Sequence, residues 1–438
     1  MTSVHLTNAY HDASGGIRTF YRALLSAAPR HGRRVCLVVP RETDGVEDVN
    51  ASARIYFVRA VASPIVDRRY RLILPHRFLL PSVSRIWRIL DAERPELVEV
   101  CDKYSLCYLA GILRKTRSRR PALVGLSCER MDDNVRSFVR DAPAAARFAH
   151  WYIREIYAPQ FDAHIANSEY TASELEPHNP RHPRPVFVRH MGVDTINFTP
   201  ARGDAERRRR RRAELGAGPH DPVLFFAGRL SAEKHAPLLL DMMRELPVTR
   251  GRLVIAGDGP LRPAMERRAA SEFAGRVHFL SNITDRGALA DWLTDVDLFV
   301  HPNPCEPFGI APLEAMAAGL PVVVPDRGGV RTYASPANAW LATPDGGGLA
   351  TAVVRALVYV EERERRRRRA LETAAAHAWP SAAARFFDLY DQLALRHSRP
   401  FRVQRPSAAP LPIRRSRETD HLEPDRGTAG AVVPAIWR

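Results

Sequence analysis

A chain of 438 residues is too long for one hydrophobic core and suits two domains of ordinary size, which its 45% of hydrophobic residues can fill. No stretch of about 20 uncharged apolar residues is present, and the start of the chain lacks the basic and then apolar pattern of a signal peptide. We therefore expect a cytoplasmic protein. Five scattered cysteines without a CxxC pair predict reduced thiols and argue against a structural zinc site.

The formal net charge is +16, from 65 basic and 49 acidic residues, and much of it lies in two arginine-rich runs, residues 207–212 and 363–369. Such runs attract polyanions, either nucleic acid or the anionic leaflet of a membrane. Because no aromatic residues for base stacking are interleaved with them, specific nucleic-acid recognition is not indicated. Two interpretations stay open: peripheral binding to an anionic membrane surface, and a solvated helix face.

Strands and helices alternate along the first part of the chain. A strand over residues 4–7, a turn at Gly15 and Gly16, a helix over 17–28 and a strand over 34–39 are typical of a βαβ unit. Further strands are predicted at residues 97–101, 122–127, 163–167 and 185–189. Residues 197–217, which hold a proline, a glycine and the first arginine run, are expected to connect two domains.

A second alternating series follows, with strands predicted at residues 223–227, 252–256, 277–280, 297–301 and 321–324. Alternation of this regularity predicts an α/β protein with doubly wound parallel sheets, whose helices cover both faces. In such sheets a ligand binds at the carboxyl ends of the strands. Residues 397–438 are rich in proline, arginine, serine and alanine, and we expect that tail to be disordered.

The most informative segment is residues 297–325, DLFVHPNPCEPFGIAPLEAMAAGLPVVVP. Pro312 fits the first position of a helix and Gly319 fits its stop, so the helix is about two turns long. Its amino end would lie against residues 306–310, where unpaired amides and the positive end of the helix dipole favour an anion. Gly309 would let a phosphate approach the backbone closely.

Two glutamates, Glu306 and Glu314, are spaced along this segment, and Glu314 is expected in the first helical turn. Because a carboxylate is repelled by phosphate, its natural partners are hydroxyls: a ribose diol for Glu314 and sugar hydroxyls for Glu306. Alternatively, Glu314 only complements the helix dipole, worth about 0.3–1 kcal/mol, and Glu306 is a solvated loop residue. The pattern as a whole favours ligand binding.

The segment EPFGIAPLE, residues 306–314, resembles the Glu-seven-residues-Glu signature of the retaining GT-B glycosyltransferases of family 4, also called glycosyl transferases group 1. Further segments resemble the family in its order: Asn167-Ser168, MGVDTINFTP (191–200), FAGRLSAEK (226–234) and IAGDGPL (255–261). The resemblance covers most of residues 1–396.

The resemblance implies the GT-B architecture, in which two Rossmann-like domains face each other across a cleft. Residues 1–200 would form the acceptor domain and residues 201–378 the nucleotide-sugar donor domain. A helix within residues 379–396 would cross back to the first domain.

The implied reaction moves a hexose from GDP-mannose or a UDP-hexose to a hydroxyl of a glycan or glycolipid, at the inner face of the membrane, with retention and without a metal or another cofactor. The leaving diphosphate needs cations and dipoles aimed at it. The implied roles are diphosphate binding by Arg229 and Lys234, phosphate binding by the amides of Phe308, Gly309 and Ile310, sugar positioning by Glu306, ribose binding by Glu314, closure from the opposite domain by Gly15 and Gly16, and base contacts around Gly257 and Asn282.

Two departures from the family pattern concern the acceptor side and the sugar pocket. Many relatives carry a histidine after the strand matched here by residues 123–127, whereas this chain has Ser127-Cys128-Glu129. Glu129 is the candidate for the acceptor-side base or hydrogen-bond partner, and Asp102 is the alternative. Arg331 stands where relatives often place a glutamate, which either alters the far wall of the sugar pocket or changes nothing.

Other functions and one other motif compete with this prediction. The arginine runs weakly favour a basic nucleic-acid-binding protein, and a GT-B enzyme that is not a transferase, such as a sugar-nucleotide epimerase, would share the same donor site. A phosphorylase would need a distinctive pyridoxal lysine motif, which the chain lacks. Asp295-Val296-Asp297 resembles a metal-binding DxD, but the first aspartate ends a predicted helix and the second opens a buried strand, which favours a structural role.

Overall fold

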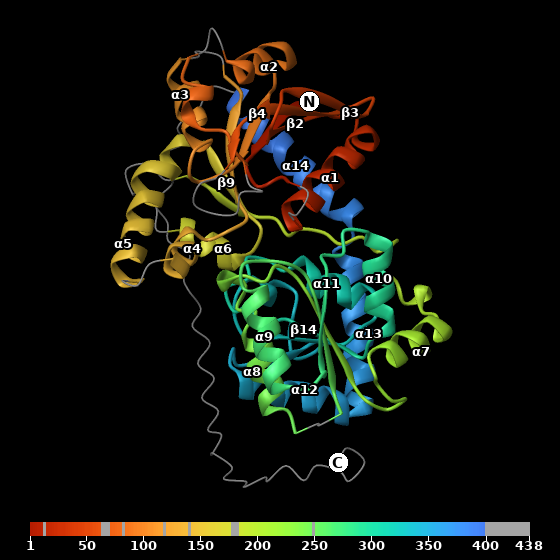
Figure 1. Ribbon diagram of the computed structural model, residues 1–438. Coiled ribbons are helices and arrows are strands. Elements are labelled where there is room, and N and C mark those ends of the chain that lie inside the picture. The colour runs from red at the N-terminus through yellow and green to blue at the C-terminus, as the bar shows by residue number, and fades with distance from the viewer. Residues whose placement is uncertain are drawn as a thin grey trace, which may run out of the picture.

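The computed structural model describes residues 1–11, 15–62, 71–80, 84–116, 120–138, 142–176, 184–247 and 250–398. The predicted disordered tail lies outside these residues from position 399 on, whereas His397 still belongs to the last helix. Figure 1 shows two α/β domains stacked along the long axis of the molecule, the first built from the amino-terminal half of the chain and the second from most of the rest.

The first domain is built on an eight-stranded sheet of order β10-β9-β8-β7-β1-β2-β4-β3. The strands are β1 (Thr2–Thr7), β2 (Arg34–Arg41), β3 (Gly45–Asn50), β4 (Ala53–Arg59), β7 (Leu97–Cys101), β8 (Ala122–Ser127), β9 (Ala163–Ala166) and β10 (Val186–Val188), and a separate antiparallel ribbon joins β5 (Val61–Ala62) to β6 (Arg71–Leu72).

The predicted parallel arrangement holds for the first sheet except at one edge, where β3, a strand that the sequence pattern does not predict, runs antiparallel to β4. Asn50 makes the tight connection, because its side-chain oxygen accepts a hydrogen bond from the amide of Ser52 at 2.9 Å. Every residue of β3 is at least partly exposed, so the strand lacks the apolar run that marks a buried parallel strand.

The first helix packs one apolar stripe against β2, β3 and β4 of this sheet. In α1 (Gly16–Ala27) the buried residues are Phe20, Tyr21, Leu24 and Leu25, at the spacing of one helix face. The other helices are α2 (Arg85–Glu93), α3 (Cys107–Thr116), α4 (Met131–Phe138), α5 (Ala142–Tyr152) and α6 (Glu169–Leu175), with a π-helical turn η3 (Ile153–Tyr157) after α5.

The second domain contains a six-stranded parallel sheet of order β13-β12-β11-β14-β15-β16, which confirms the predicted parallel arrangement there. Its strands are β11 (Val223–Ala227), β12 (Arg252–Ala256), β13 (Val277–Leu280), β14 (Leu298–Val300), β15 (Val322–Pro325) and β16 (Trp340–Ala342). Its helices are α7 (Ala205–Glu214), α8 (Leu238–Glu245), α9 (Arg262–Glu272), α10 (Arg286–Asp295), α11 (Ile310–Ala317), α12 (Gly346–Val358) and α13 (Val360–Ala376), with 3₁₀ turns at η5 (Pro200–Arg202), η6 (Ala232–Lys234) and η7 (Gly329–Thr332).

The predicted interdomain connection over residues 197–217 contains a helix, α7, which packs on α10 of the second domain. Asp204 caps α7 by accepting a hydrogen bond from the amide of Arg207 at 2.9 Å. The side chains of Arg207 and Arg212 then reach Asp295 at 2.6 Å and Asp297 at 2.9 Å. The two aspartates of the DxD-like sequence are therefore occupied by the arginine run.

The arginine runs are largely paired within the protein. Each arginine of residues 207–212 has a carboxylate within 4 Å, and Arg212 is only 7% exposed. In the second run, Arg363 donates to the carbonyl of Leu357 at 3.0 Å and Arg367 to that of Gly319 at 2.8 Å. Carboxylates and backbone carbonyls of the protein therefore bind the guanidinium groups of the inward-facing arginines, whereas the side chains of Arg209 and Arg210 are 73% and 65% exposed.

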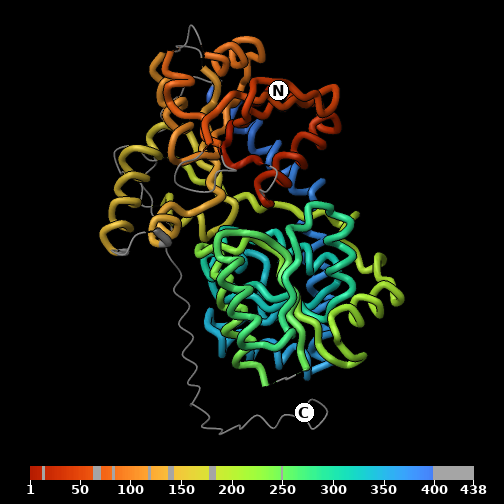
Figure 2. Tube along the Cα trace, viewed as in Figure 1, coloured from red at the N-terminus to blue at the C-terminus, as the bar shows by residue number. Residues whose placement is uncertain are grey.

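The last helix, α14 (Trp379–Ser398), packs against α1, β7 and β8 of the first domain. In Figure 2 this blue helix lies beside the red amino-terminal segments, although the two are far apart in sequence. The interface between α14 and the first domain includes a fully buried carboxylate, Glu99. This carboxylate accepts hydrogen bonds from Tyr390 and, at 3.1 Å, from Tyr21. His5 Nδ1 lies 2.9 Å from the same carboxylate.

None of the helices in the described part of the chain combines the length and the apolar character that a membrane crossing requires.

Replacing Tyr390 by phenylalanine should destabilise the protein by about 1–3 kcal/mol, because a buried carboxylate oxygen loses its donor. Burial and Glu99 raise the pKa of Tyr390, so its hydroxyl stays protonated and donates at neutral pH. Urea unfolding followed by circular dichroism measures the loss. The control is Tyr359→Phe, whose side chain is 55% exposed, and equal stability of the two variants would contradict a structural role for the Glu99 contact.

Candidate active site

The candidate site lies where the carboxyl ends of the second sheet face the first domain. The loop after β11 carries Arg229, which is half-buried, and Lys234, while the loop after β14 carries Glu306. Gly16 lies opposite, since a Cβ atom built on it would be 3.4 Å from Ile310 Cδ1. The structure therefore brings the Gly15-Gly16 turn of the first domain against the start of α11.

Glu306 is the most heavily contacted of the predicted site residues. Lys234 Nζ lies 3.0 and 2.8 Å from its two carboxylate oxygens, and Asn303 Nδ2 donates to Oε2 at 2.9 Å. His301 Nε2 lies 3.3 Å from the same oxygen. Burial by itself raises the pKa of Glu306, but Lys234 and His301 outweigh it and hold that pKa well below its ordinary value. The carboxylate is therefore ionised at neutral pH, and both of its oxygens are engaged.

The loop between Glu306 and α11 has a conformation that only glycine adopts easily. Gly309 has φ of +84°, and a Cβ atom there would lie 2.8 Å from Val330 Cγ1. Tyr333 Oη donates to the carbonyl of Gly309 at 2.5 Å, and the amide of Gly329 donates to the carbonyl of Glu306 at 2.6 Å. Because η7 holds the loop carbonyls, the amides at the start of α11 stay available for an anion.

The structure corrects the predicted start of this helix. Gly309 precedes α11 and Ile310 is its first residue, so Pro312 occupies the third position and Glu314 lies in the second turn. The predicted length of about two turns is confirmed by the eight residues of α11. A glutamate in the second turn gains little from the helix dipole, which acts within the first turn, so the dipole does not explain Glu314.

Glu314 is 3% exposed and accepts a hydrogen bond from Arg286 at 2.5 Å. Burial raises the pKa of Glu314 above its ordinary value, although Arg286 acts in the opposite direction. Sequence reasoning missed Arg286, whose guanidinium also lies 4.5 Å from the ring centre of Phe198. Its position was the available signal: it opens α10 directly after β13, and so lies at the same sheet edge as the other site residues.

Gly257 and Asn282 follow the neighbouring strands β12 and β13. A Cβ atom on Gly257 would lie 1.9 Å from the carbonyl oxygen of Gly228, so glycine is required for the loops after β11 and β12 to pack together. The amide of Leu230 donates to Asp258 O at 2.9 Å across the same loops, which places Arg229 in a fixed segment. Asn282 is exposed just past the end of β13.

Phe308 is 2% exposed and connects the two domains rather than facing a ligand with its ring. Its ring centre lies 6.3 Å from that of His190, in a stacked arrangement, and 5.3 Å from that of Tyr333. Beside it, Ser168 Oγ of the first domain donates to the carbonyl of Pro307 at 2.5 Å. Ser168 and His190 thus hold the loop over residues 306–310 from the opposite domain.

Glu129 and Asp102, the two acceptor-side candidates, have different surroundings. Asp102 accepts hydrogen bonds from the amides of Ser105 at 2.6 Å and Leu106 at 2.7 Å, and so caps the turn before α3. Glu129 is half-buried and accepts one bond, from Asn134 Nδ2 at 2.9 Å. Burial raises the pKa of Glu129, with Lys103 opposing the rise and Asp102 adding to it. Of the two candidates, Asp102 is therefore the one whose carboxylate holds a turn of the backbone.

Other predicted features lie outside this cluster. Among the described residues, no group of three or more His, Cys, Asp or Glu side chains is arranged to hold a metal ion. Arg331 donates to the carbonyl of Ala334 at 2.7 Å, within its own turn.

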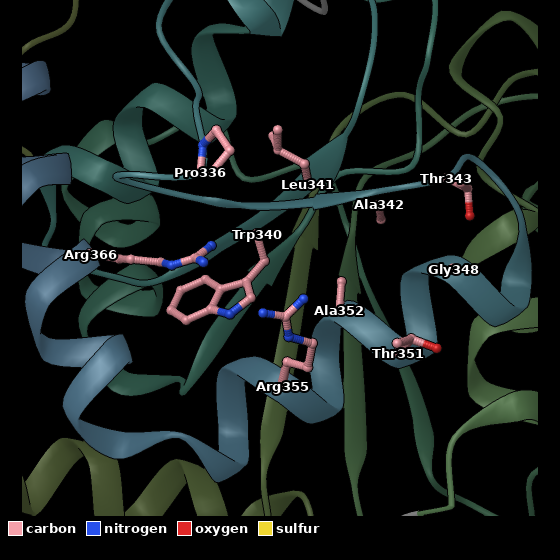
Figure 3. A pocket seen from close by; sticks show the side chains of 10 residues that line it. All are labelled: Pro336, Trp340, Leu341, Ala342, Thr343, Gly348, Thr351, Ala352, Arg355 and Arg366. Atoms are coloured by element: carbon pink, nitrogen blue, oxygen red, sulfur yellow. The ribbon is translucent and has the colours of Figure 1, made fainter. Parts of the chain in front are cut away.

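A cavity of about 490 Å³ runs along the edge strand β16 and is separate from the candidate site, because its lining residues come from β16, the segments beside that strand, α12 and α13. In Figure 3 the guanidinium groups of Arg355 and Arg366 lie on either side of the Trp340 indole. Arg366 lies 4.7 Å from the centre of that ring and donates to the carbonyl of Ala339 at 2.5 Å. None of the predicted site residues lines this cavity.

Removing Lys234 should destabilise the protein by about 1–3 kcal/mol at neutral pH, because a mostly buried carboxylate loses its cation. A carboxyl with a lowered folded pKa contributes stability that is present above its unfolded pKa and lost as the pH falls through the folded pKa. The cost of Lys234→Gln should therefore shrink below about pH 4.

Urea unfolding at several pH values measures this dependence. In a Glu306→Gln background, Lys234→Gln should cost much less, because no charge is left for the lysine to pair with. A pH-independent cost in both backgrounds would show that the pair does not hold the site together.

Two family models match the chain, one for each domain. The model described as Glycosyltransferase Family 4 matches residues 14–196, and the model described as Glycosyl transferases group 1 matches residues 207–377.

Relatives with named activities are similar over most of their length. A GDP-mannose-dependent alpha-(1-6)-phosphatidylinositol dimannoside mannosyltransferase of Mycobacterium tuberculosis H37Ra is 31% identical, over 88% of this chain and 94% of the relative. A D-inositol 3-phosphate glycosyltransferase of Jonesia denitrificans is 29% identical, over 76% of this chain and 80% of the relative. Sucrose-phosphate synthase from Thermosynechococcus elongatus has a similar structure, with a TM-score of 0.72 at 20% identity over 90% of this chain and 99% of that one. This likeness confirms the GT-B fold.

Proposed function

The chain belongs to the group 1 glycosyl transferases, and from that membership and the site geometry we propose that it is a retaining transferase that moves a hexose from a nucleoside diphosphate to a hydroxyl of a glycolipid or glycan. The observation that carries the proposal is the pairing of Lys234 with Glu306 beside the start of α11, with Gly16 facing it from the other domain. A cation, a helix amino end and an ionised carboxylate thus meet at one point between the domains.

The residues divide the work of a nucleotide-sugar site. The amides of Gly309 and Ile310 and the side chains of Arg229 and Lys234 would bind the diphosphate and stabilise the charge that grows on it as the bond to the sugar breaks. Glu306 would accept hydrogen bonds from sugar hydroxyls and stabilise the positive charge at the anomeric carbon. Because these positive groups are supplied by the protein, the proposed mechanism requires no metal ion.

Transfer on one face of the sugar is consistent with the hydrogen bonds that Glu306 accepts. The bond between the anomeric carbon and the diphosphate oxygen breaks, the acceptor oxygen bonds to that carbon from the same face, and the acceptor proton passes to the departing diphosphate. A double displacement would instead need a carboxylate free to attack the anomeric carbon. Both oxygens of Glu306 are engaged by Lys234 and Asn303, which favours positioning over attack.

Glu314 would bind the ribose with the carboxylate oxygen that lies outside its contact with Arg286. The carboxylate is buried beside the start of α11. Glu129 would accept a hydrogen bond from the acceptor hydroxyl from the side of the first domain, and so orient it, while the proton itself passes to the diphosphate. Burial raises the pKa of Glu129, which makes its carboxylate a stronger hydrogen-bond acceptor than an ordinary one.

The names of the relatives favour particular donors and acceptors. The mycobacterial relative uses GDP-mannose and a phosphatidylinositol dimannoside, and the second relative is named for an inositol phosphate. We infer GDP-mannose as the first donor to test, ahead of a UDP-hexose, and an inositol-containing glycolipid as the first acceptor. These names also favour transfer over the alternative of a sugar-nucleotide epimerase. The nucleic-acid alternative loses its support because the arginine runs are paired internally.

Glu306→Gln should lower kcat by at least about a hundredfold while leaving the Kd of the nucleotide within about threefold, because the carboxylate acts on the sugar in the transition state. Glu314→Gln should instead raise the KM of the donor and the Kd of the nucleotide by about tenfold. Initial rates and calorimetric titration with the free nucleotide separate the two effects. Glu361→Gln, an exposed glutamate on α13, is the control, and equal activity of all variants and the parent would reject the site.

Thermal-shift measurements with GDP, UDP and ADP identify the donor class. A nucleotide present at about a hundred times its Kd stabilises the folded state by about 2.7 kcal/mol, so the preferred base gives the largest rise in Tm. GDP should give that rise. A larger shift with UDP or ADP would contradict the GDP-mannose inference and leave the transferase proposal standing.

A further inference from the structure

The outer face of α5 carries two large aromatic side chains in contact with solvent. Phe148 is 54% exposed and Trp151 is 48% exposed, and their ring centres lie 5.8 Å apart. The adjoining face of the helix is buried through Ala149, Tyr152 and, in the following turn, Ile153, and the ring centre of Tyr152 lies 6.4 Å from that of Phe148. The two exposed rings are therefore a surface feature of a helix that has already buried its own apolar stripe, and they are not needed to fold it.

Cationic side chains lie near these rings along the chain and on the neighbouring helix. Arg147 is exposed beside Phe148, and Arg154 follows one turn after Trp151 with 49% of its side chain exposed. Arg136 on the neighbouring helix α4 is 48% exposed. Glu155, 2.7 Å from Arg154, is the one acidic side chain on the exposed face of this turn. A helix face with Trp, Phe and several arginines has the chemistry of a helix that lies in the interface of an anionic bilayer.

This face lies on the acceptor side of the molecule. Figure 1 shows α5 at the outer edge of the first domain, beside α4. The helices α4 and α5 pack together, and α4 also contacts η6, the turn of the second domain that carries Lys234. Asn134 of α4 holds the carboxylate of Glu129 at 2.9 Å. A surface that binds α5 therefore lies one helix away from the groups proposed to receive the acceptor.

We propose that the outer face of α5, through Phe148, Trp151, Arg147 and Arg154, docks the protein on an anionic lipid bilayer and presents the cleft to a lipid-linked acceptor. The proposal rests on the transferase function above for its purpose. The α5 face replaces the arginine runs as the proposed membrane contact. The inward-facing arginines of those runs are bound by carboxylates and carbonyls of the protein itself. The rings on α5, in contrast, add apolar surface that can enter the bilayer interface.

Co-sedimentation of the full chain with vesicles tests the docking surface without any substrate. The parent should bind phosphatidylcholine vesicles that contain phosphatidylglycerol, and should bind pure phosphatidylcholine vesicles at least about tenfold more weakly, because the lipid charge contributes to binding. Phe148→Ser with Trp151→Ser should lower binding to the anionic vesicles by about tenfold or more. Tyr359→Ser with Val360→Ser is the matched control, since these residues are 55% and 54% exposed on the second domain.

A second pair of variants separates the two cationic regions. Arg147→Gln with Arg154→Gln should weaken binding to the anionic vesicles. Arg209→Gln with Arg210→Gln, in the first arginine run and with side chains 73% and 65% exposed, should leave it within about twofold of the parent. If binding weakens only in the Arg209 and Arg210 double variant, the proposal is overturned and the membrane contact returns to the arginine run.

Further measurements distinguish the remaining outcomes. The Phe148 and Trp151 double variant should keep the Tm shift with GDP, which shows that it is folded. Loss of a dimer in sedimentation velocity without any loss of vesicle binding would overturn the proposal in favour of an interface between copies of the chain, and unchanged binding to both vesicle types would overturn it outright. If vesicle binding depends on α5 but no glycolipid is glycosylated, the docking surface stands and the acceptor assignment in the proposed function fails.

Discussion

The ion pair between Lys234 and Glu306 is the interaction on which the candidate site depends, because it joins the loop after β11 to the loop after β14. Two strands that are neighbours in the sheet thereby present their loops as one surface. The same pair keeps Glu306 ionised and occupies both of its oxygens. A buried carboxylate without this lysine would take up a proton more readily, and the site would lose that negative charge.

Contacts from the first domain complete the site. Ser168 donates to Pro307 O, Phe308 packs against His190, and Gly16 approaches Ile310. The loop over residues 306–310 is therefore contacted from both domains, by η7 in the second domain and by Ser168 and His190 of the first. The crossing helix α14, anchored at the buried Glu99, ties the two domains together a second time. Closure of the cleft over a donor would exclude water from the reacting centre.

The arginine runs show how net charge along a sequence differs from charge on a surface. Arg207 and Arg212 are drawn to Asp295 and Asp297, and Arg363 and Arg367 bind the carbonyls of Leu357 and Gly319. These arginines fasten α7 and α13 to the second domain, so little of their charge is free to attract a partner. The exposed rings on α5, which the charge pattern of the sequence does not indicate, are the surface proposed for membrane docking.

The sequence by itself determined the α/β class, most strands of both sheets and the Glu306 to Glu314 segment, because buried strands and glycine or proline stops leave a local record in residue order. The sequence pattern did not predict the hairpin of β3, the edge strand β16 or the true start of α11. Short or exposed strands lack the apolar run that marks a buried strand. Only the tertiary structure decided which groups meet. Arg286 binds Glu314, and the first arginine run pairs with the DxD-like aspartates. Asp102 caps a turn, while Glu129 stays half-buried beside Asn134. Partners that are far apart in the chain become neighbours only where strands and helices pack.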